Sequence, residues 1–207
     1  MGERILLREF YSGATPVKTT FLTEYEQLDV RKNNTMYLNG IFQRANVLNQ
    51  NGRIYSRDIL EREDKKFQEK IQYNLSTGEC DHPDTAVLTL RNISHLIVET
   101  WWEDDALWGK LRILNTEAGR YLKDLVNERI PLAISSRGMG SVREASGKTF
   151  VNDDFDLICY DCVADPSTPG AFLNLVAESK HSNFSNNQNF QGKEYSISSI
   201  LNEILKK

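Results

Sequence analysis

Hydrophobic and polar positions repeat along the chain with two different periods, and each change of period marks an expected element. The run 36–48 is rich in strand-forming residues and is interrupted by Gly40, which predicts a strand with a bend. Leu60, Phe67 and Ile71 form one apolar stripe in an otherwise charged segment. This stripe predicts an amphipathic helix over residues 57–73.

The second half of the chain shows the same two patterns. Two apolar, strand-like runs flank a polar turn at 103–105 and predict a β-hairpin formed by 93–102 and 107–114. Helical spacing of apolar residues predicts a helix over 116–128. Further strands are expected at 132–135, 149–151 and 155–164, with Gly138 and Gly140 marking a tight loop after the first of them.

The composition changes near the C-terminus and divides the chain into three parts. Residues 1–178 are expected to form one folded domain. Residues 179–195 are rich in Asn, Ser and Gln, which is typical of a flexible linker. Residues 196–207 regain an apolar stripe and predict a short amphipathic helix, which at this length needs a surface to dock on.

Composition and charge exclude several classes of protein. The 207 residues carry a net charge of -4, which is unlike the basic surface of a nucleic-acid-binding protein. No apolar run approaches the roughly 18 residues of a membrane helix, and the N-terminus lacks the features of a signal peptide. Three cysteines, an odd and small number, argue against a disulfide framework. We therefore expect an intracellular protein.

The first stretch that could carry chemistry is Gly78-Glu79-Cys80-Asp81-His82-Pro83. His82 lies between turn residues and beside two acids, and a histidine that titrates near neutral pH is the usual general base. By itself the stretch is equally compatible with a surface histidine that has no function.

The second stretch is the serine-rich segment 134–141. Ser135 and Ser136 end an apolar strand and meet a glycine-rich turn, where backbone N–H groups can converge on an oxyanion. Taken alone, the segment is more typical of an ordinary strand end.

The third stretch is the predicted strand 155–163, which carries Asp161. Alternation along a strand places Asp161 on the same face as Phe155, Leu157, Cys159 and Val163. A carboxylate on an apolar face requires a partner, and a histidine that donates N–H is a natural one. The other interpretation is that the strand has reached the surface by this position. Together the three stretches supply a base, a nucleophile and an orienting acid, although the sequence does not show that they converge.

At these residues the chain resembles the prohead core protein proteases of large tailed phages, over roughly residues 36–170. The matching pieces are Gly40-Ile41-Phe42, Asn51-Gly52-Arg53-Ile54-Tyr55, Gly78-Glu79 with His82-Pro83, Trp101-Trp102, Ser135-Ser136-Arg137-Gly138-Met139-Gly140-Ser141, and Asp161 followed by Val163 and Pro166-Ser167. The Gly-Glu-x-x-His-Pro and Ser-Ser-Arg-Gly-x-Gly pieces, in this order, are far more specific together than either is alone.

The resemblance implies an α+β fold built on a closed antiparallel β-barrel wrapped by helices, as in the herpesvirus assemblins. It implies a serine endopeptidase with His82, Ser135 and Asp161 as catalytic residues and no cofactor. Its substrates would be scaffold and capsid proteins and the enzyme itself, cut after Glu, in a prohead core assembled in the bacterial cytoplasm. A homo-oligomer is possible, and no nucleic-acid or membrane partner is expected. Weaker assignments, to the oxyanion site or its support, are Ser136, Arg137, Gly138 and Glu79.

Two features depart from the assemblins. Asp161 stands where they have a second histidine, and Cys162-Val163-Ala164-Asp165 stands where they have an Arg-Arg pair. The choice of Ser135 over Ser136 depends on the resemblance and on strand alternation.

Three alternatives remain at this stage. One is a scaffold- or capsid-binding module that keeps the fold without the activity. A second is a zinc site formed by Cys80, His82, Cys159 and Cys162, whose side chains are types that zinc accepts. Redox chemistry by the Cys159/Cys162 pair is weaker, because the pair does not precede a helix that would lower a thiol pKa.

Overall fold

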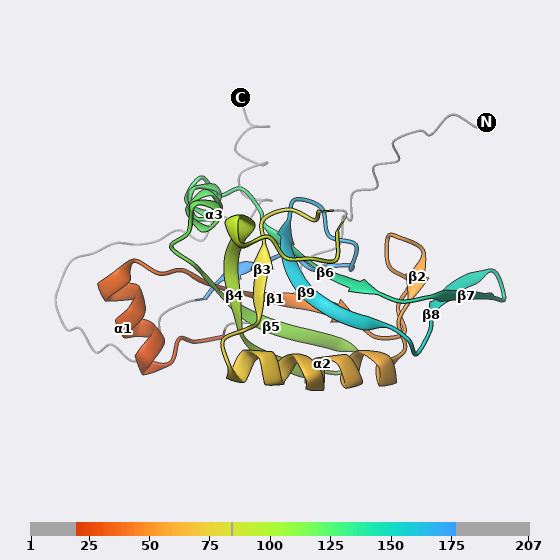
Figure 1. The fold of residues 1–207 in the computed structure, drawn as a ribbon. Coiled ribbons are helices and arrows are strands. Elements are labelled where there is room, and N and C mark those ends of the chain that lie inside the picture. The colour runs from red at the N-terminus through yellow and green to blue at the C-terminus, as the bar shows by residue number, and fades with distance from the viewer. Residues whose placement is uncertain (1–19, 84, 177–207) are drawn as a thin grey trace, which may run out of the picture.

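The computed structural model describes residues 20–83 and 85–176, which form three α-helices, one short 3-10 helix and ten strands (Figure 1). The helices are α1 (Glu24–Asn33), α2 (Arg57–Gln72), the 3-10 helix η1 (Leu90–Asn92) and α3 (Glu117–Asn127). The strands are β1 (Tyr37–Arg44), β2 (Arg53–Ile54), β3 (Thr77–Glu79), β4 (Ile93–Glu103), β5 (Ala106–Ile113), β6 (Ala133–Met139), β7 (Val142–Ala145), β8 (Lys148–Val151), β9 (Asp156–Val163) and β10 (Asn174–Leu175).

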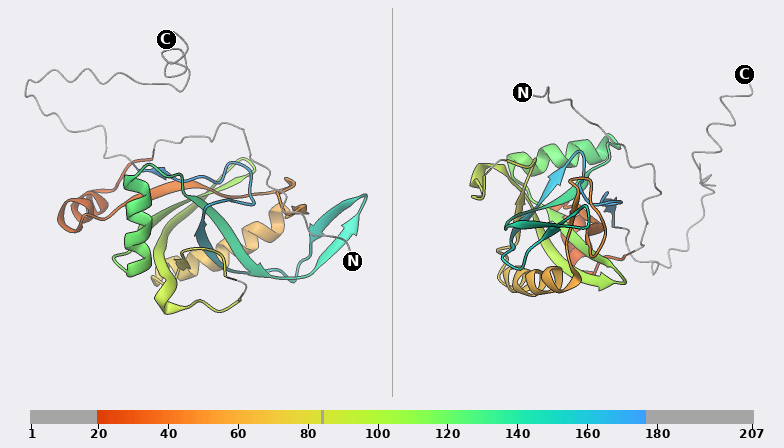
Figure 2. Two further views of the ribbon diagram at one scale, coloured as in Figure 1. Left: turned by 90° about the horizontal axis from the view of Figure 1, so that it is seen from above. Right: turned by 90° about the vertical axis from the view of Figure 1, so that its right-hand side faces the viewer.

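These strands form three sheets. The largest has the order β10-β1-β5-β4-β3 and is antiparallel throughout, a second has the order β2-β8-β7, and the third is the β6-β9 pair. In the second sheet β2 runs parallel to β8, and the β7-β8 hairpin projects from one end of the molecule (Figure 1). Helices α2 and α3 lie on opposite sides of the strands (Figure 2).

The described strands do not form the single closed antiparallel barrel that the resemblance implies. Only isolated bridges connect the β6-β9 pair with its neighbours, one between Cys80 and Cys162 and one between Ala133 and Phe172. The first bridge is parallel and stays isolated because β3 is only three residues long and has a bulge at Gly78/Glu79. The architecture is therefore an α+β arrangement of sheets and helices.

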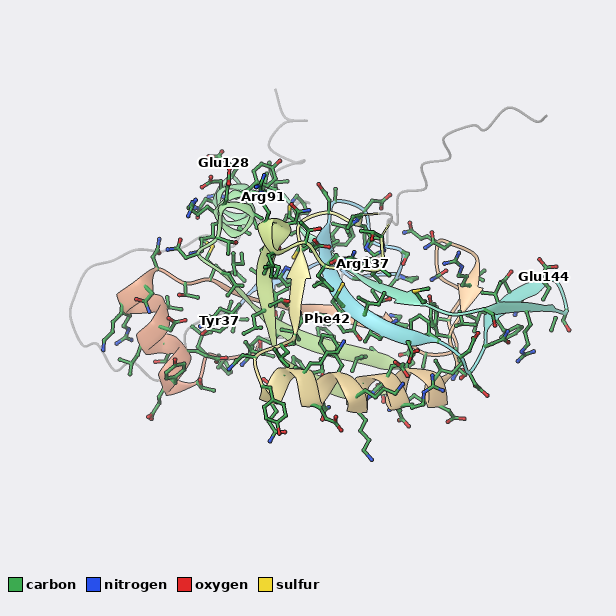
Figure 3. The ribbon with its side chains drawn as sticks, viewed as in Figure 1. Tyr37, Phe42, Arg91, Glu128, Arg137 and Glu144 are labelled. Carbon is green, nitrogen blue, oxygen red and sulfur yellow. The ribbon has the colours of Figure 1, made fainter. Side chains whose placement is uncertain are left out.

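The core lies between these sheets and α2. The ring of Tyr160 is fully buried and packs against Phe42 and Phe67, with ring centroids 4.9 and 5.1 Å away. Figure 3 labels Phe42 in this core above α2. Helix α2 begins where the Ser56 side chain accepts from the backbone N–H of Ile59, and it turns its apolar residues toward this core. Burial of three aromatic rings in one contact fixes α2 against β1 and β9.

The helices predicted over 57–73 and 116–128 and the hairpin predicted from 93 to 114 are confirmed. The strand predicted at 132–135 instead continues as β6 to Met139, through Gly138. A Cβ atom at Gly138 would lie 2.5 Å from the Phe155 ring, so this glycine permits close packing and does not form a turn. Likewise, the irregularity expected at Gly40 in β1 is a bulge at Phe42.

The predicted linker (179–195) and terminal helix (196–207) lie outside the described residues, as do residues 1–19 and 84. The domain expected over 1–178 is described only between residues 20 and 176. Within that part of the chain, no helix is both long enough and apolar enough to cross a membrane.

We predict that His95 makes stability depend on pH. His95 is fully buried between Ser94 Oγ and the Tyr160 carbonyl, and burial lowers its pKa to about 4. Between pH 6.5 and 4 the unfolded chain takes up a proton at this histidine and the native chain does not, so stability falls as the pH falls. When the pH is lowered from 7.5 to 5.5, the free energy of unfolding of the wild type should fall by about 1 kcal/mol more than that of His95→Gln. Urea unfolding at the two pH values measures this difference. An equal loss in the two proteins would contradict this.

Candidate active site

The pairing of β6 with β9 decides which side chains meet. Ser135 lies opposite Asp161 and Arg137 lies opposite Cys159, and Arg137 contacts both Asp161 and Cys159. Residues directly opposite in an antiparallel pair share one face of the sheet. Ser135, Arg137 and Asp161 therefore project from the same face, and Ser136 projects from the other.

Asp161 is fully buried and is surrounded by donors. Its Oδ1 atom accepts from the backbone N–H of Glu79 at 3.1 Å and from Arg137 Nη2 at 3.2 Å, and Oδ2 lies 2.9 Å from Arg137 Nε. Burial by itself raises the pKa of Asp161, but His82, the Glu79 N–H and Arg137 outweigh burial and hold the pKa below its usual value. The carboxylate is thus ionised at neutral pH.

Glu79 balances the charge of Arg137. Its carboxylate forms an ion pair with Arg137 Nη2 and accepts from the backbone N–H of Thr89 at 2.7 Å. Burial alone lowers the pKa of Arg137, but the two carboxylates, Glu79 and Asp161, outweigh it and raise that pKa. One buried guanidinium therefore joins β6, β3 and β9.

Gly78 permits this close approach of β3 to β9. A Cβ atom at this position would lie 1.9 Å from the carbonyl oxygen of Tyr160 and 2.4 Å from Nε2 of His95. Only glycine fits such a contact, which explains the Gly78-Glu79 pair that the sequence singled out.

His82 is held against Asp161 by the residues that precede it. Asp81 has a positive φ of 67° and donates its N–H to the carbonyl of Cys162, next to the bridge between Cys80 and Cys162. His82 Nδ1 then lies 2.9 Å from Asp161 Oδ2, while 41% of the His82 side chain stays exposed. With Nδ1 facing the carboxylate, Nε2 is left as the ring nitrogen that can accept a proton.

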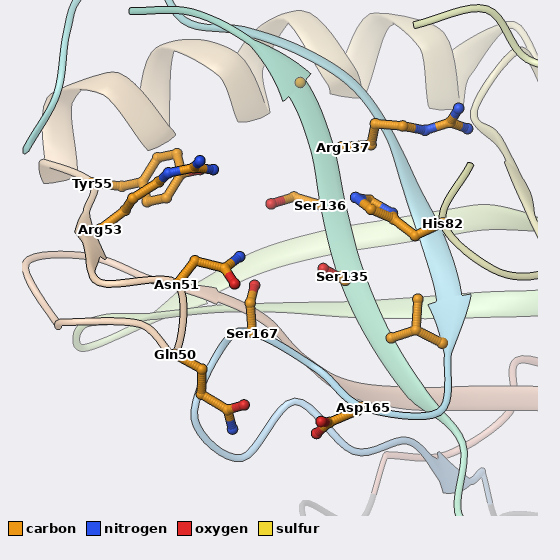
Figure 4. Close-up of a pocket in the computed structure, with 12 residues that line it drawn as sticks. Gln50, Asn51, Arg53, Tyr55, His82, Ser135, Ser136, Arg137, Asp165 and Ser167 are labelled. Carbon is orange, nitrogen blue, oxygen red and sulfur yellow. The ribbon is translucent and has the colours of Figure 1, made fainter. Parts of the chain in front are cut away.

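His82 and Ser135 line the same pocket, which has a volume of about 500 Å³ (Figure 4). Ser135 is 7% exposed, and no hydrogen bond joins these two described side chains. Such a contact often closes only when a substrate is bound. The remaining lining residues are Gln50, Asn51, Arg53, Tyr55, Ser136, Arg137, Gly138, Val163, Asp165 and Ser167.

Ser136 has a different environment from Ser135. Its Oγ accepts from Gln43 Nε2 at 2.9 Å, and Gln43 Oε1 in turn accepts from the Tyr160 hydroxyl at 3.1 Å. Ser136 also lies toward Tyr55 in Figure 4, on the side of β6 away from His82. The structure thus brings His82 and Asp161 together on the face of Ser135, and places Ser136 apart from them.

Two of the weaker assignments are changed by the geometry. Both terminal nitrogens of Arg137 are used, since Nη1 donates to the Thr85 carbonyl at 2.7 Å and Nη2 donates to Glu79, Cys159 and Asp161. Its buried Nε lies 2.9 Å from Asp161 Oδ2 as an ion pair without an aligned hydrogen bond. It is therefore not free to bind an oxyanion. Gly138 lines the pocket from within β6 and not from the tight turn that we expected.

The face expected for Asp161 is also partly corrected. Cys159 does lie beside Asp161, with Sγ donating to Oδ1 at 3.3 Å. Leu157 instead joins the apolar core with Tyr160, because a bulge between Arg137 and Gly138 shifts the pairing by one residue.

The zinc and redox alternatives do not fit this arrangement. Within residues 20–83 and 85–176, no three His, Cys, Asp or Glu side chains are grouped so as to hold a metal ion. Cys162 faces the apolar core, and Cys159 lies on the opposite face beside Arg137. Burial, followed by Asp161, raises the pKa of Cys159 to about 12, and burial also raises the pKa values of Cys80 and Cys162. All three are free thiols, and these shifts keep them protonated at neutral pH.

Comparison with known proteins now identifies the family. A model of the prohead core protein serine protease family matches residues 9–181. The chain belongs to this family. It is 33% identical over 144 residues to the prohead core protein protease of Enterobacteria phage T4, covering 67% of this chain and 68% of that protein. It also matches the solved structure of the bacteriophage T4 capsid assembly protease gp21, with a TM-score of 0.58 and 30% identity over 61% of this chain and 80% of the other.

Several residues of this prohead protease site had no role assigned from the sequence. Thr85 and Thr89 contribute backbone groups to the buried network, and Gln43 holds Ser136, but nothing in a local pattern marks them. Arg53 and Tyr55 line the pocket and belong to a stretch that the resemblance singled out without a function. That resemblance was the one signal that could have located them.

We predict that Arg137 stabilises the site by neutralising its carboxylates. Arg137→Met leaves Glu79 and Asp161 buried without their counter-charge, which should cost about 3 kcal/mol of unfolding free energy at pH 7.5. The loss should shrink at pH 5, because the uncompensated carboxyls have raised pKa values and regain a proton there. Urea unfolding at both pH values measures this, with the exposed Arg120→Met as control. A loss that does not change with pH would contradict the prediction.

Proposed function

We propose that this prohead protease is a serine endopeptidase in which Ser135 is the nucleophile, His82 the general base and Asp161 the orienting acid. The observation that carries the proposal is the 2.9 Å contact between His82 Nδ1 and the buried Asp161 carboxylate, on the face of β6-β9 that also presents Ser135. A base oriented by an ionised acid beside a serine has the arrangement needed for acyl transfer.

The proposed mechanism uses each group at a named atom. Ser135 Oγ attacks the scissile carbonyl while His82 Nε2 accepts its proton. Asp161 holds Nδ1–H and stabilises the imidazolium that forms. His82 then returns the proton to the leaving amine, and a water molecule hydrolyses the acyl-enzyme by the same route. For the oxyanion we propose backbone N–H groups between Ser136 and Gly138, which line the pocket beside the nucleophile.

The proposed substrates are scaffold and capsid proteins inside the immature head, cleaved after Glu with an aliphatic residue two positions earlier. Membership of the prohead family and the similarity to a T4 capsid assembly protease support the choice of scaffold and capsid proteins. The preference for Glu is carried over from the resemblance described above. The site of action would be a prohead assembled in the host cytoplasm.

Autocleavage is part of the proposal, and the fold restricts where it could occur. Five triplets have Leu or Ile two positions before Glu, of which Ile59-Leu60-Glu61 lies in α2 and Ile97-Val98-Glu99 lies in β4. A third, Leu22-Thr23-Glu24, contains the buried Leu22 and the N-cap of α1. The remaining two, Leu7-Arg8-Glu9 and Leu201-Asn202-Glu203, lie near the termini and outside the described residues, and we propose them as self-cleavage sites.

The first prediction concerns the two adjacent serines. The wild type should cleave a Leu-x-Glu-Ala peptide, and Ser135→Ala should lower kcat by about 10⁴-fold or more, because it removes the nucleophile. Ser136→Ala is the matched control and should retain most of the activity, since its Oγ is held by Gln43 on the other face. A fluorophosphonate probe should label the wild type at Ser135.

The opposite pattern, in which only Ser136→Ala is inactive, would refute the assignment of the nucleophile. Absence of both cleavage and labelling in the wild type, even when it is mixed with scaffold protein, would favour a non-catalytic binding module.

A further inference from the structure

The pocket is lined by two arginines whose charges are used differently. Arg137 is buried and forms ion pairs with Glu79 and Asp161. Arg53 is exposed, and no carboxylate of the described residues forms an ion pair with its guanidinium. Arg53 is therefore the arginine of this pocket whose charge remains available to a ligand.

The backbone at Arg53 is held in a fixed turn. Asn49 Oδ1 accepts from the N–H groups of Asn51 and Arg53 at 3.0 and 2.9 Å, and the Asn49 N–H donates to the Arg53 carbonyl at 2.9 Å. Gly52 adopts the positive φ of 71° that this turn requires. Gln50 then donates its N–H to the carbonyl of Ser167 at 2.8 Å, which ties the turn to a segment after β9 that also lines the pocket. The site thus has a preorganised position for its cation.

The side chain of Arg53 lies along the ring of Tyr55, on the side of the pocket that faces β6 (Figure 4). Tyr55 is itself fixed by an edge-on contact with Phe155, with ring centroids 5.2 Å apart. Burial raises the pKa of the Tyr55 hydroxyl, and the charge of Arg53 partly opposes that shift, which agrees with their proximity. The Tyr55 ring supports the Arg53 side chain, whose guanidinium also hydrogen-bonds to the Tyr55 hydroxyl, and Arg53 still lines the pocket.

The pocket has opposite charges at its two ends. Asp165 is exposed and also lines it, and in Figure 4 Arg53 and Asp165 lie at opposite ends of the labelled residues, with Asn51 and Ser167 between them and Ser135 beside these on β6. A peptide bound across Ser135 would therefore meet a cation on one side of the nucleophile and an anion on the other. This polarity favours an acidic side chain at the Arg53 end and disfavours one at the Asp165 end.

We propose that Arg53 is a specificity-determining residue that binds an acidic side chain of the substrate next to the bond that is cut. A guanidinium forms two parallel hydrogen bonds with a carboxylate, a geometry that neither an amide nor a lysine side chain reproduces. The inference rests on the proposed function, since it assigns the substrate-recognition part of the same site. The inference goes beyond the proposed function by naming Arg53 as the residue that binds the acidic side chain.

The test compares peptides Leu-x-X-Ala in which X is Glu, Gln or Lys, cleaved by the wild type and by Arg53→Gln, Arg53→Lys and Arg53→Glu. The wild type should prefer Glu over Gln by about 100-fold in kcat/KM. Arg53→Gln should lose most of this preference, because cleavage of the Glu peptide should slow far more than cleavage of the Gln peptide. Arg53→Lys should recover part of it, and Arg53→Glu should favour Lys over Glu.

A matched control and a pH series complete the test. Arg120→Gln removes an exposed arginine from α3 and should keep the wild-type preference. The Glu/Gln ratio of the wild type should fall as the pH drops through the pKa of the peptide's own Glu, about 4.3, because the ligand loses its charge. Fluorophosphonate labelling of each variant shows that the catalytic residues remain intact.

The outcomes separate the two proposals. A labelled, active wild type that cuts the Glu and Gln peptides equally, or an Arg53→Gln variant that keeps the preference for Glu, would overturn the role of Arg53 and leave the proposed function standing. A wild type that is neither labelled nor active would refute the proposed function, and the inference would fall with it.

Discussion

The site depends on one buried carboxylate. Asp161 has no exposed surface, and an ionised group in that position is strongly unfavourable unless it is surrounded by donors. Arg137 and the Glu79 N–H provide most of that compensation, and His82 provides the rest from the solvent side. Because the compensation comes from β3, β6 and the segment after β3, the same carboxylate fixes the positions of all three relative to β9.

Strand alternation on β6 then separates two serines that are adjacent in sequence. Ser135 faces the charged network, while Ser136 faces Gln43 and the Tyr160 hydroxyl at the edge of the core. A one-residue shift of the β6-β9 pairing would exchange these environments completely. The close contact of Gly138 with Phe155 and the bulge beside it help to fix that pairing, so this packing determines which hydroxyl faces Asp161.

The pocket contains two arginines, Arg137 and Arg53, whose charges have different surroundings. The charge of Arg137 is consumed inside the protein, where it neutralises carboxylates and stabilises the fold. The charge of Arg53 is kept at the surface by a rigid turn and an aromatic support. Of the two arginines in this pocket, the buried one is used within the protein, and the exposed one is the residue proposed for recognition.

The sequence by itself determined the helices at 57–72 and 117–127 and the β4-β5 hairpin, because their apolar periodicity and turns are local features. It also identified His82, Ser135 and Asp161 as candidates, through short stretches that resemble a known family. It did not determine the closure of the sheets, the extension of β6 through Gly138, or the partners of Arg137, Thr85 and Thr89. Those depend on contacts between segments far apart in the sequence, such as the hydrogen bond from Glu79 to Asp161 across 82 residues. Only the tertiary structure brings such segments together, since the free energy of a buried ion network depends on which groups share it and not on any local pattern.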